Sequence, residues 1–540
     1  MLTQIEKQQF RGLLFRHLDG IVMAPAAFAL HEKKVLSYLL KNKTVFLKEI
    51  TEQFNANEGY LNAALRLLCS YGWLVQKIDN ENDIIEYGLS DSSEIAFNHV
   101  HHYEDVVKLL KYSEQFHQRK FELEPFLALI KIFEKFKNNY GLTISNDEKT
   151  QIIQQQILDH IEGHIVGPTT VRLGMSGMFH KYFMEAPFRP EEFHRDVKSF
   201  GKLLDMFSYL GWFDEKNGTY QFTEKGLFYA KRASAYGVTV SYTPMFRKLD
   251  EMIFGDPEIL RTRDQLETEI HVDRATNVWG SGGAHAVYFN AIDEIIVKLF
   301  NQPIDKQPKG ILDMGCGNGA FLQHIFDVID QQTARGKLLD EYPLFIVGAD
   351  YNQIALKIAK ENLINADIWA KVIFGDVGKP DVLAEKLKKD YDINLIDLLN
   401  VRTFLDHNRP WRPPKINNPS RASQSTGAFV YRGKRINNNL IEDSLVEHFL
   451  EWAPYIKKFG LLMMELHTLP PLVTAAHIGK TPATAYDGTH SFSDQYIVEL
   501  DVFLKAASEA ELYSDPKFHK KFPDTEFSTV TIHLLKGKSF

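Results

Sequence analysis

Residues 310–322 read GILDMGCGNGAFL, an apolar run that ends in Asp313 and is followed by Gly315, Gly317 and Gly319 at alternate positions. Glycine has no Cβ atom, so the backbone can turn sharply here and approach a ligand closely. The spacing G-x-G-x-G differs from the G-x-G-x-x-G that seats a pyrophosphate at a helix start. A carboxylate before the first glycine would repel a pyrophosphate and suits a cationic amino-acid ligand. The stretch therefore predicts a strand, a turn and a helix, either as a nucleotide site or as a connection that binds nothing.

From about residue 308 the chain alternates between apolar strands and amphipathic helices. Strand patterns include PLFIVGAD at 343–350, AKVIFGD at 370–376 and GLLMMELH at 460–467, and the segments between them have helical spacing. This alternation predicts an α/β fold, a Rossmann-like, doubly wound and mostly parallel sheet with helices on both faces. In such a sheet the ligand lies beyond the carboxyl ends of the strands, at the switch point near the first strand.

Two further carboxylates stand at the ends of predicted strands. Asp350 ends the second strand, where an acid can accept hydrogen bonds from both ribose hydroxyls, and Asp376 ends the third, where it can accept from an adenine amino group. DMGCGNG followed by GAD and FGD resembles the class I S-adenosylmethionine-dependent methyltransferases, over about residues 305–540. The resemblance implies S-adenosylmethionine as cofactor, with a binding set of Asp313, Gly315, Gly317, Gly319, Asp350 and Asp376.

Length and composition limit the number of domains and the classes of partner that the molecule can have. The 540 residues predict three or four domains, and a net charge of −8 gives no support for a nucleic-acid partner. The only cysteines, Cys69 and Cys316, look like reduced thiols and cannot form a four-cysteine zinc site. Charges interrupt the apolar runs of the first 20 residues, and we expect no signal peptide, no membrane span and a cytoplasmic location.

A weak internal repeat occupies the first half of the chain. GIVMAPAAFAL at 20–30 is echoed by GHIVGPTTVRL at 163–173, and RLLCSYGWL at 66–74 by DMFSYLGWF at 205–213. A polar turn and a short strand-like run follow each Gly-Trp pair, as in winged-helix modules. The predicted organisation is therefore a winged-helix-like unit at 1–100, a helical insertion at 101–162, a second winged-helix-like unit at 163–235, a helical connector or lid at 236–304, and the methyltransferase domain at 305–540.

Two features of this front half have alternative interpretations. The candidate recognition helix, EGYLNAALRLLCSYG at 58–72, has Arg66 as its single basic residue. DNA reading needs basic and amide side chains, so a role in homodimerisation or in covering the substrate is favoured. In NVWGSGGAHAVYF at 277–289 the glycines indicate a turn or a close backbone approach, or else a plain loop.

Histidines follow the later predicted strands and approach the same sheet edge. His407 lies in LLNVRTFLDHNRPW at 398–411, His467 ends the strand at 460–467, and His490 lies in the predicted loop AYDGTHSFSDQY at 485–496. Three interpretations stay open: neutral histidines with a carboxylate or amide hold a transition metal, one histidine is a general base, or all are hydrogen-bonded loop residues.

The tandem winged-helix front with I-V-x-x-P, FLDHNRPW at 404–411 and THSFSDQY at 489–496 resemble the metal-dependent polyketide-type C-methyltransferases of apratoxin-like loading modules. The resemblance implies one iron or manganese ion and methylation of a malonyl unit on an acyl carrier protein. It assigns His490 and Gln495 as metal ligands, with His407 or His467 as the third. The metal would chelate the two carbonyl oxygens of the acceptor and stabilise its enolate.

Residues 402–435 contain eight cations and one acid, Asp406. This long loop could receive a phosphopantetheine phosphate, coenzyme A or an acidic carrier protein, or could simply be solvated. The favoured function is metal-assisted C-methylation of a malonyl-type acyl thioester or 1,3-dicarbonyl acceptor, either a small molecule or carrier-bound. The alternatives are a metal-free small-molecule O-methyltransferase with His407 or His467 as catalytic base, and a winged-helix regulator that senses S-adenosylmethionine.

Overall fold

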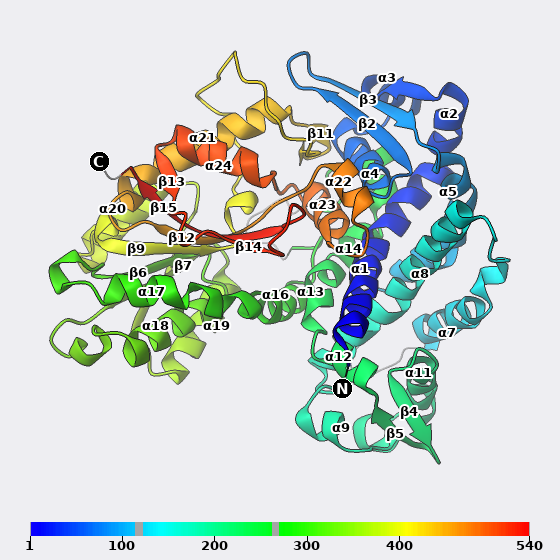
Figure 1. The fold of residues 1–540 in the computed structure, drawn as a ribbon, viewed down its shortest axis with the longest axis horizontal. Coiled ribbons are helices and arrows are strands. Elements are labelled where there is room, and N and C mark those ends of the chain that lie inside the picture. Colours follow the sequence, from blue (N-terminus) through cyan, green and yellow to red (C-terminus); the bar gives the residue numbers. More distant parts are fainter. Residues whose placement is uncertain (1, 114–122, 262–268, 539–540) are drawn as a thin grey trace. The chain divides into compact units, whose positions relative to one another are not determined.

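The computed structural model describes residues 2–113, 123–261 and 269–538 and divides the chain into two compact units (Figure 1). The first unit contains Met1–Ala284, Val430–Arg435 and Pro470–Ser493, and the second contains His285–Phe429, Ile436–Leu469 and Asp494–Phe540. Two segments from within 305–540 thus belong to the same unit as the front half. Residues 114–122 of the predicted insertion and 262–268 of the predicted connector lie outside the described residues.

The second unit is built on an eight-stranded sheet of order β13-β15-β12-β9-β6-β7-β8, with β14 paired to β15. Five strands are parallel, and β15 runs antiparallel to β12, while β13 and β14 pair antiparallel with β15. The chain reverses its direction of travel across the sheet between β6 and β9, which is the switch point at which such sheets bind ligands. The strands are β6 (Gly310–Met314), β7 (Phe345–Asp350), β8 (Ala370–Phe374), β9 (Leu398–Thr403), β12 (Leu461–Leu466), β13 (Leu512–Ser514), β14 (Lys520–Phe522) and β15 (Val530–Gly537).

Helices cover both faces of this sheet (Figure 1). The central strands are apolar and buried on both sides, as Ile311, Leu399 and Leu462 show, because each face packs against helices. The predicted α/β fold class is therefore confirmed. One face carries α17 (Asp293–Phe300), α18 (Ala320–Gln332) and α19 (Gln353–Asn365), and the other α20 (Pro380–Tyr391), α21 (Asn438–Ile456) and α24 (Leu500–Glu509).

Three element predictions in this region need correction. The pattern YDINLIDLL at 391–399 predicts the fourth strand, but the strand begins only at Leu398, after a 3-10 turn over Leu395–Asp397. The pattern at 493–512 predicts a helix, but the helix begins at Leu500. The predicted loop 485–496 is largely helical, because α23 spans Ala483–Phe492. Ala485 and Phe492 of α23 are buried, and α23 packs against α1 and α4 within the first unit. Tertiary packing, which local sequence does not reveal, decides that helix.

Two winged-helix-like units are present in the first unit. In the first, the strands form a sheet of order β1-β3-β2 beside three helices, and in the second β4 and β5 form a two-stranded ribbon after α11. Trp73 and Trp212 of the two Gly-Trp pairs are both buried. The elements are α2 (Val35–Asn42), β1 (Thr44–Phe46), α3 (Leu47–Phe54), α4 (Glu58–Ser70), β2 (Leu74–Asp79) and β3 (Ile84–Leu89), then α11 (Val197–Tyr209), β4 (Phe213–Lys216) and β5 (Thr219–Phe222).

Two long helices, α1 (Gln4–Glu32) and α8 (Glu148–Met175), pack together and carry the first pair of repeated segments. A Cβ atom on Gly20 would stand 2.3 Å from the Cα atom of His160, and one on Gly163 would stand 2.4 Å from the backbone oxygen of His17. The repeated glycines therefore allow the two helix backbones to approach closely, which explains why the repeat begins with glycine.

The remaining helices fill the predicted insertion and connector. They include α6 (Glu104–Leu110), α7 (Leu123–Lys137), α13 (Ser234–Ser241), α15 (Leu249–Phe254) and α16 (Arg274–Phe289). The glycines at 280–283 lie inside α16 and form no turn. The predicted close backbone approach is present, because a Cβ atom on Gly280 would stand 2.6 Å from the Cα atom of Gly237.

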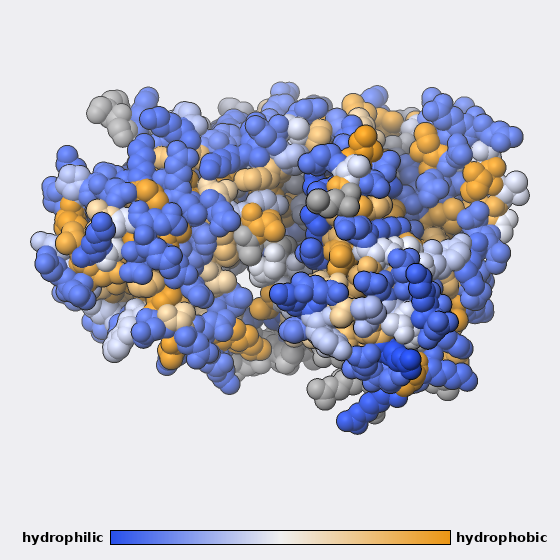
Figure 2. Space-filling view, turned by 60° about the horizontal axis from the view of Figure 1, so that its bottom comes forward, coloured by the Kyte–Doolittle hydropathy of each residue, from blue (hydrophilic) through white to orange (hydrophobic). Residues whose placement is uncertain are grey.

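Among the described residues, one helix is long and apolar enough to span a membrane. That helix is α1, and 78% of its most apolar 18-residue window is buried inside the protein, as is usual for a core helix. Hydrophilic residues cover most of the face shown in Figure 2. The cytoplasmic location remains a prediction.

Candidate cofactor and acceptor site

The glycine-rich loop between β6 and α18 is held against β7. The amides of Gly315 and Cys316 donate to the carbonyl oxygen of Ala349 at 2.7 and 3.1 Å. Gly315, Gly317 and Gly319 have φ angles of 81°, 53° and 81°, which favour glycine. No other atom lies within 4 Å of the place where a Cβ atom on Gly317 would stand. The loop therefore leaves open space beside its backbone, as close approach of a ligand requires.

Asp313 is fully buried at the end of β6, and neither oxygen of its carboxyl group has a hydrogen-bond partner among the described residues. Burial, and then the neighbouring Asp350 carboxylate, raise the pKa of Asp313 to about 8. A buried polar group without a partner is costly. The ammonium of a bound amino-acid moiety would supply both the missing hydrogen bond and a countercharge. This orphaned carboxyl group fits S-adenosylmethionine.

Asp350, at the end of β7, connects the glycine loop to the next helix. Its Oδ2 atom accepts from the amide of Gly317 at 3.0 Å, and its Oδ1 atom accepts from the amide of Asn352 at 2.8 Å. The carboxylate thus orders the loop and lies at the strand end where a ribose is expected. The adjacent Tyr351 is 49% exposed, and its ring centroid lies 5.3 Å from that of Phe374. These two rings offer an apolar surface for adenine that the sequence analysis missed.

Asp376 follows β8 and is surrounded by polar partners. Its Oδ1 atom accepts from the amide of Gly378 at 2.9 Å. Two cations approach its Oδ2 atom, Arg412 at 3.7 Å and Lys379 at 3.8 Å. Contact between Asp376 and adenine remains a prediction, and Arg412 is an additional residue at this strand end.

The loop after β9 places a histidine beside a glutamate of β12. The Nδ1 atom of His407 lies 2.6 Å from the Oε1 atom of Glu465, and both side chains are buried. The Oε2 atom of Glu465 accepts from the amide of Asp406 at 2.9 Å. Leu405, two residues before His407, lies 3.0 Å from the place of a Cβ atom on Gly315. The histidine is therefore held within the same strand-end cluster as the glycine loop.

A second buried network of hydrogen bonds and ion pairs holds this loop in place. Asp406 bonds Arg402 at 2.5 Å and the Nε2 atom of His448 at 2.8 Å, and the Arg402 guanidinium stacks 3.9 Å from the Trp452 ring centre. Burial works to raise the pKa of Asp406, but Arg402 and His448 hold it below its usual value. Asp406 is therefore a carboxylate that fixes the backbone next to His407.

His467 is buried and hydrogen-bonded, and its predicted roles as base or metal ligand remain predictions. Its Nδ1 atom lies 3.3 Å from the carbonyl oxygen of Val498, and its Nε2 atom lies 2.7 Å from the hydroxyl of Thr531. Burial lowers the pKa of His467 to about 3, so the imidazole is neutral. Both ring nitrogens are engaged in this structure, so a role as base or metal ligand would require one of these contacts to be exchanged.

Another histidine, His285 of α16, faces the same region and was missed by the sequence analysis. Its ring centroid lies 4.1 Å from that of Phe404, which has a left-handed φ of 53°. The surrounding protein, and then the nearby His407, lower the pKa of His285 to about 3. The signal was present in the sequence, because His285 follows the glycines at 280–283. The left-handed backbone of Phe404 is strained, and such strain is common at functional sites.

The other predicted metal ligands are divided between the two units. His490 lies on α23 in the first unit, and its Nδ1 atom donates to the carbonyl oxygen of Tyr486 at 2.6 Å. Gln495 and His407 belong to the second unit. His407 and His490 each have Nδ1 on an oxygen, which orients Nε2 as the ligand nitrogen, the usual state of a metal-bound histidine. Across the three described stretches, no three histidine, cysteine, aspartate or glutamate side chains are arranged to hold a metal ion.

The basic segment 402–435 is anchored by internal ion pairs. Arg421 is buried and contacts Glu442, Asp443 and Glu509. The segment ends in the hairpin of β10 (Val430–Tyr431) and β11 (Lys434–Arg435), which belongs to the first unit. Much of the positive charge predicted to attract an acidic partner is thus compensated within the protein. Further pairs join Arg402 to Asp406, Arg412 to Asp376, Arg432 to Glu258, and Arg435 to Glu58 and Asp83.

Three family models match the chain in order. They describe an AprA N-terminal domain at residues 10–76, an AprA winged helix domain at 162–256 and an AprA MT2-like methyltransferase domain at 269–533. No curated protein matches the sequence. The methyltransferase match covers the stretch that contains the glycine loop, the strand-end carboxylates and the His407–Glu465 pair.

Solved structures of methyltransferases also resemble the chain at low identity. The mitomycin 7-O-methyltransferase MmcR is 11% identical, with a TM-score of 0.39 over 70% of this chain and 97% of its own. PigF with SAH is 12% identical, with a TM-score of 0.39 over 70% and 99%. The CurJ carbon methyltransferase is 11% identical, with a TM-score of 0.34 over 80% and 99%. Resemblances this distant do not bear on the reaction or on the acceptor.

Proposed function

We propose that this S-adenosylmethionine-dependent methyltransferase uses His407, oriented by Glu465, to remove a proton from the acceptor as the methyl group is transferred. The observation that carries the proposal is the 2.6 Å contact between the Nδ1 atom of His407 and the Oε1 atom of Glu465. A carboxylate on Nδ1 fixes the tautomer that leaves a lone pair on Nε2, and it stabilises the imidazolium that forms.

The atoms and charges of the methyl-transfer step balance without a further reactant. The acceptor atom attacks the methyl carbon of the sulfonium, the carbon–sulfur bond breaks, and S-adenosylhomocysteine leaves. The proton of the acceptor passes to the Nε2 atom of His407 and from there to water. The protein contributes by aligning donor and acceptor and by placing charge, which is the usual source of catalysis in a direct displacement.

We propose a carbon acceptor between two carbonyl groups, such as a malonyl-type acyl thioester on coenzyme A or a carrier protein. The resemblance of FLDHNRPW and THSFSDQY to polyketide-type C-methyltransferases supports this choice. The match to the AprA MT2-like model is compatible with it. A carbon flanked by two carbonyls is acidic enough for an imidazole base to deprotonate it.

A metal-assisted form of the same reaction has support in the donor chemistry. His407, His490 and Gln495 offer two neutral imidazole nitrogens and an amide oxygen, a set that suits iron or manganese. The ion would act as a Lewis acid toward the two acceptor carbonyls. His407 would then bind and orient the metal, and Glu465 would hold the His407 ring.

O-methylation of a hydroxyl is the second candidate, because the His407–Glu465 pair could equally deprotonate a phenol. Incubation of the full chain with methyl-labelled S-adenosylmethionine separates the two. Label transferred to malonyl-coenzyme A or malonyl-pantetheine, and kept on carbon after alkaline hydrolysis of the thioester, supports C-methylation. Label transferred only to phenols such as naphthols supports O-methylation. Transfer that His407→Gln leaves unchanged would contradict the proposed base in either case.

The metal proposal is tested by elemental analysis of protein made in medium supplemented with iron and manganese. We expect about one equivalent of metal per chain, lost in His490→Ala and in Gln495→Ala. His477→Ala is the matched control, because His477 lies on the same segment, 470–493, and has no proposed metal role. A protein without stoichiometric metal that keeps full activity after chelation would exclude the ion and leave the general-base form.

A further inference from the structure

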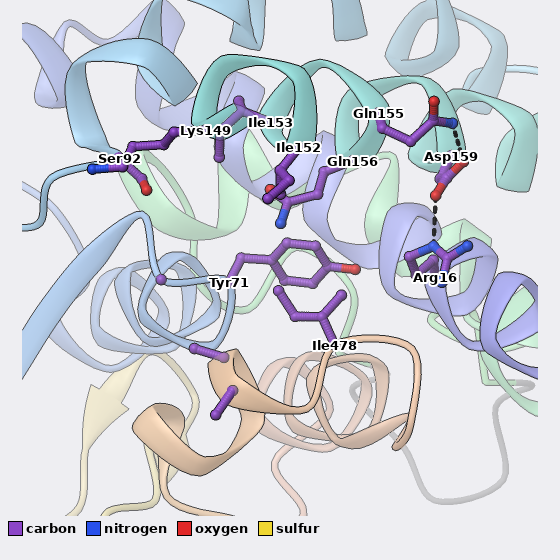
Figure 3. Close-up of a pocket in the computed structure, with 13 residues that line it drawn as sticks. Arg16, Tyr71, Ser92, Lys149, Ile152, Ile153, Gln155, Gln156, Asp159 and Ile478 are labelled. Carbon is purple, nitrogen blue, oxygen red and sulfur yellow. Dashed lines mark hydrogen bonds and ion pairs between the residues drawn. The ribbon is translucent and has the colours of Figure 1, made fainter. Parts of the chain in front are cut away.

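A pocket of about 540 Å³ lies wholly within the first unit, and none of the residues that line it has a proposed role in methyl transfer (Figure 3). Its walls come from α1, from α8 and from α22 (Pro471–Ala476), three segments that are far apart in sequence. The volume lies in the range of small-molecule sites. The donors, acceptors and apolar groups that line it decide what it can bind.

The polar lining combines the donors of Arg16, Lys149 and Gln156 with acceptors on Asp159 and Gln155. The Nε atom of Arg16 bonds the Oδ2 atom of Asp159 at 2.5 Å, while the two terminal nitrogens of the guanidinium make no hydrogen bond in the described part of the chain. Gln156 is 7% exposed and accepts from the indole of Trp73 at 2.9 Å, which leaves its amide NH₂ group for the pocket. The Arg16 side chain is 29% exposed and Gln156 is buried, and donors left open in such a lining favour a ligand rich in acceptor atoms.

The formal charge of the lining is positive. Arg16 and Lys149 contribute two cations against the single carboxylate of Asp159. Lys149 approaches Asp91 only at 3.5 Å, between two solvent-exposed side chains, so that pair is weak. An anionic group on a ligand would complete the hydrogen bonding of Arg16 and balance the excess charge.

The middle of the pocket is apolar. Ile152, Ile153 and Ile478 line it between the Arg16 end and the Lys149 end (Figure 3). Tyr71 also lines it, and because its hydroxyl is engaged by Asp19 at 2.9 Å, the ring is what it offers to a ligand. A ligand that covers this apolar surface needs a hydrocarbon part, because that part excludes water from the surface.

We propose that this pocket binds a small carboxylate with a hydrocarbon body, whose carboxylate contacts Arg16 and the amide of Gln156. The body of the ligand lies on the isoleucine side chains and on Ala475. Ligand binding therefore joins α22 to α1 and α8, and stabilises the packing of segment 470–493 in the first unit.

The first test compares two probes of the same shape by calorimetry on the full chain. Octanoate carries the carboxylate and octanamide replaces it with a neutral group. We expect octanoate to bind at least about tenfold more tightly, because a charge-assisted hydrogen bond to the guanidinium is lost in the amide. Equal affinities for the two probes, or no binding of octanoate at millimolar concentration, would overturn the proposal.

Substitutions of residues on the same helix test whether octanoate binds in this pocket. Ala475→Phe fills the pocket and should abolish octanoate binding. Leu472→Phe adds the same ring on the same helix, at a position that is 78% exposed and outside the lining, and should bind octanoate as the unmodified chain does. Octanoate binding that survives Ala475→Phe would place the site elsewhere and refute the assignment.

The proposal predicts opposite effects on octanoate affinity for two variants that change the charge of the lining. Arg16→Gln removes the cation and should weaken octanoate binding by about tenfold or more. Asp159→Asn keeps the shape, removes the competing carboxylate and should tighten binding. Melting temperatures show which variants still fold. If Arg16→Gln does not fold, the test rests on Asp159→Asn. Weaker octanoate binding in a folded Asp159→Asn protein would contradict the proposal.

Discussion

His407 and Glu465 are 58 residues apart in sequence, yet the Nδ1 atom of the histidine lies 2.6 Å from the Oε1 atom of the glutamate. The loop after β9 and the end of β12 supply them, and parallel strands deliver both to one sheet edge. Glu465 also accepts from the backbone amides of Asp406 and Leu466, so its carboxylate is held in place before any acceptor arrives.

Glu465→Gln should lower the rate of methyl transfer by about 10- to 100-fold, the usual effect of removing a carboxylate that orients a histidine. The Michaelis constant for S-adenosylmethionine should not change, because Glu465 is not among the cofactor residues. Steady-state kinetics with both substrates varied measures this. His467→Asn provides the comparison, and a larger loss of rate there than in Glu465→Gln would contradict the assignment.

The affinity for S-adenosylmethionine should rise with pH. Without cofactor, the pKa of Asp313 is raised to about 8, so the folded protein keeps this proton between pH 4 and 8 while the unfolded chain releases it. Asp313 therefore makes the cofactor-free protein less stable as the pH rises through that window. Binding of the cofactor ammonium ionises Asp313 and releases the proton, so affinity should increase by up to about tenfold per pH unit below pH 8.

Calorimetry at pH 6.5 and 8.5, in buffers of different ionisation enthalpy, measures both the affinity and the released proton. Asp313→Asn should bind the cofactor weakly at each pH, without proton release. Asp376→Asn is the control that keeps the pH dependence. An affinity of the unmodified chain that does not change with pH would show that Asp313 stays protonated in the complex.

Gly317→Ala should weaken cofactor binding by about tenfold or more while costing only about 1–2 kcal/mol of stability, the strain of a left-handed alanine. The added methyl group enters space that is empty in the protein and that the cofactor needs. Gly218→Ala is matched, because Gly218 has a φ of 75°, no atom within 4 Å of its Cβ position and no cofactor role. Equal cofactor affinity in the two variants would remove Gly317 from the site.

Gly20→Ala should lower the free energy of unfolding by about 1–3 kcal/mol or more, because its Cβ atom would lie 2.3 Å from the Cα atom of His160 and force α1 from α8. Gly201→Ala, in α11, meets no atom within 4 Å and should raise stability by up to about 1 kcal/mol. Chemical denaturation measures both. A neutral Gly20→Ala would mean that the two helices are free to separate.

Features written in short stretches of the chain could be predicted from the sequence. The alternation of strands and helices after residue 308, the glycines at 315–319 and the acids Asp313, Asp350 and Asp376 follow from local pattern and from the topology that parallel strands impose. The repeated Gly-Trp pairs likewise located two winged-helix-like units, because each repeat encodes its own helix and ribbon.

The partners of the histidines were decided only by tertiary structure. His407 and His467 look alike in sequence, one after a strand and one at a strand end. In the structure the Nδ1 atom of His407 lies against Glu465, while the two ring nitrogens of His467 lie against Val498 and Thr531. His490 lies on a helix that forms because its apolar side chains are buried against α1 and α4. Hydrogen bonds and packing between residues far apart in the chain leave no local pattern, so no periodicity or spacing could reveal them.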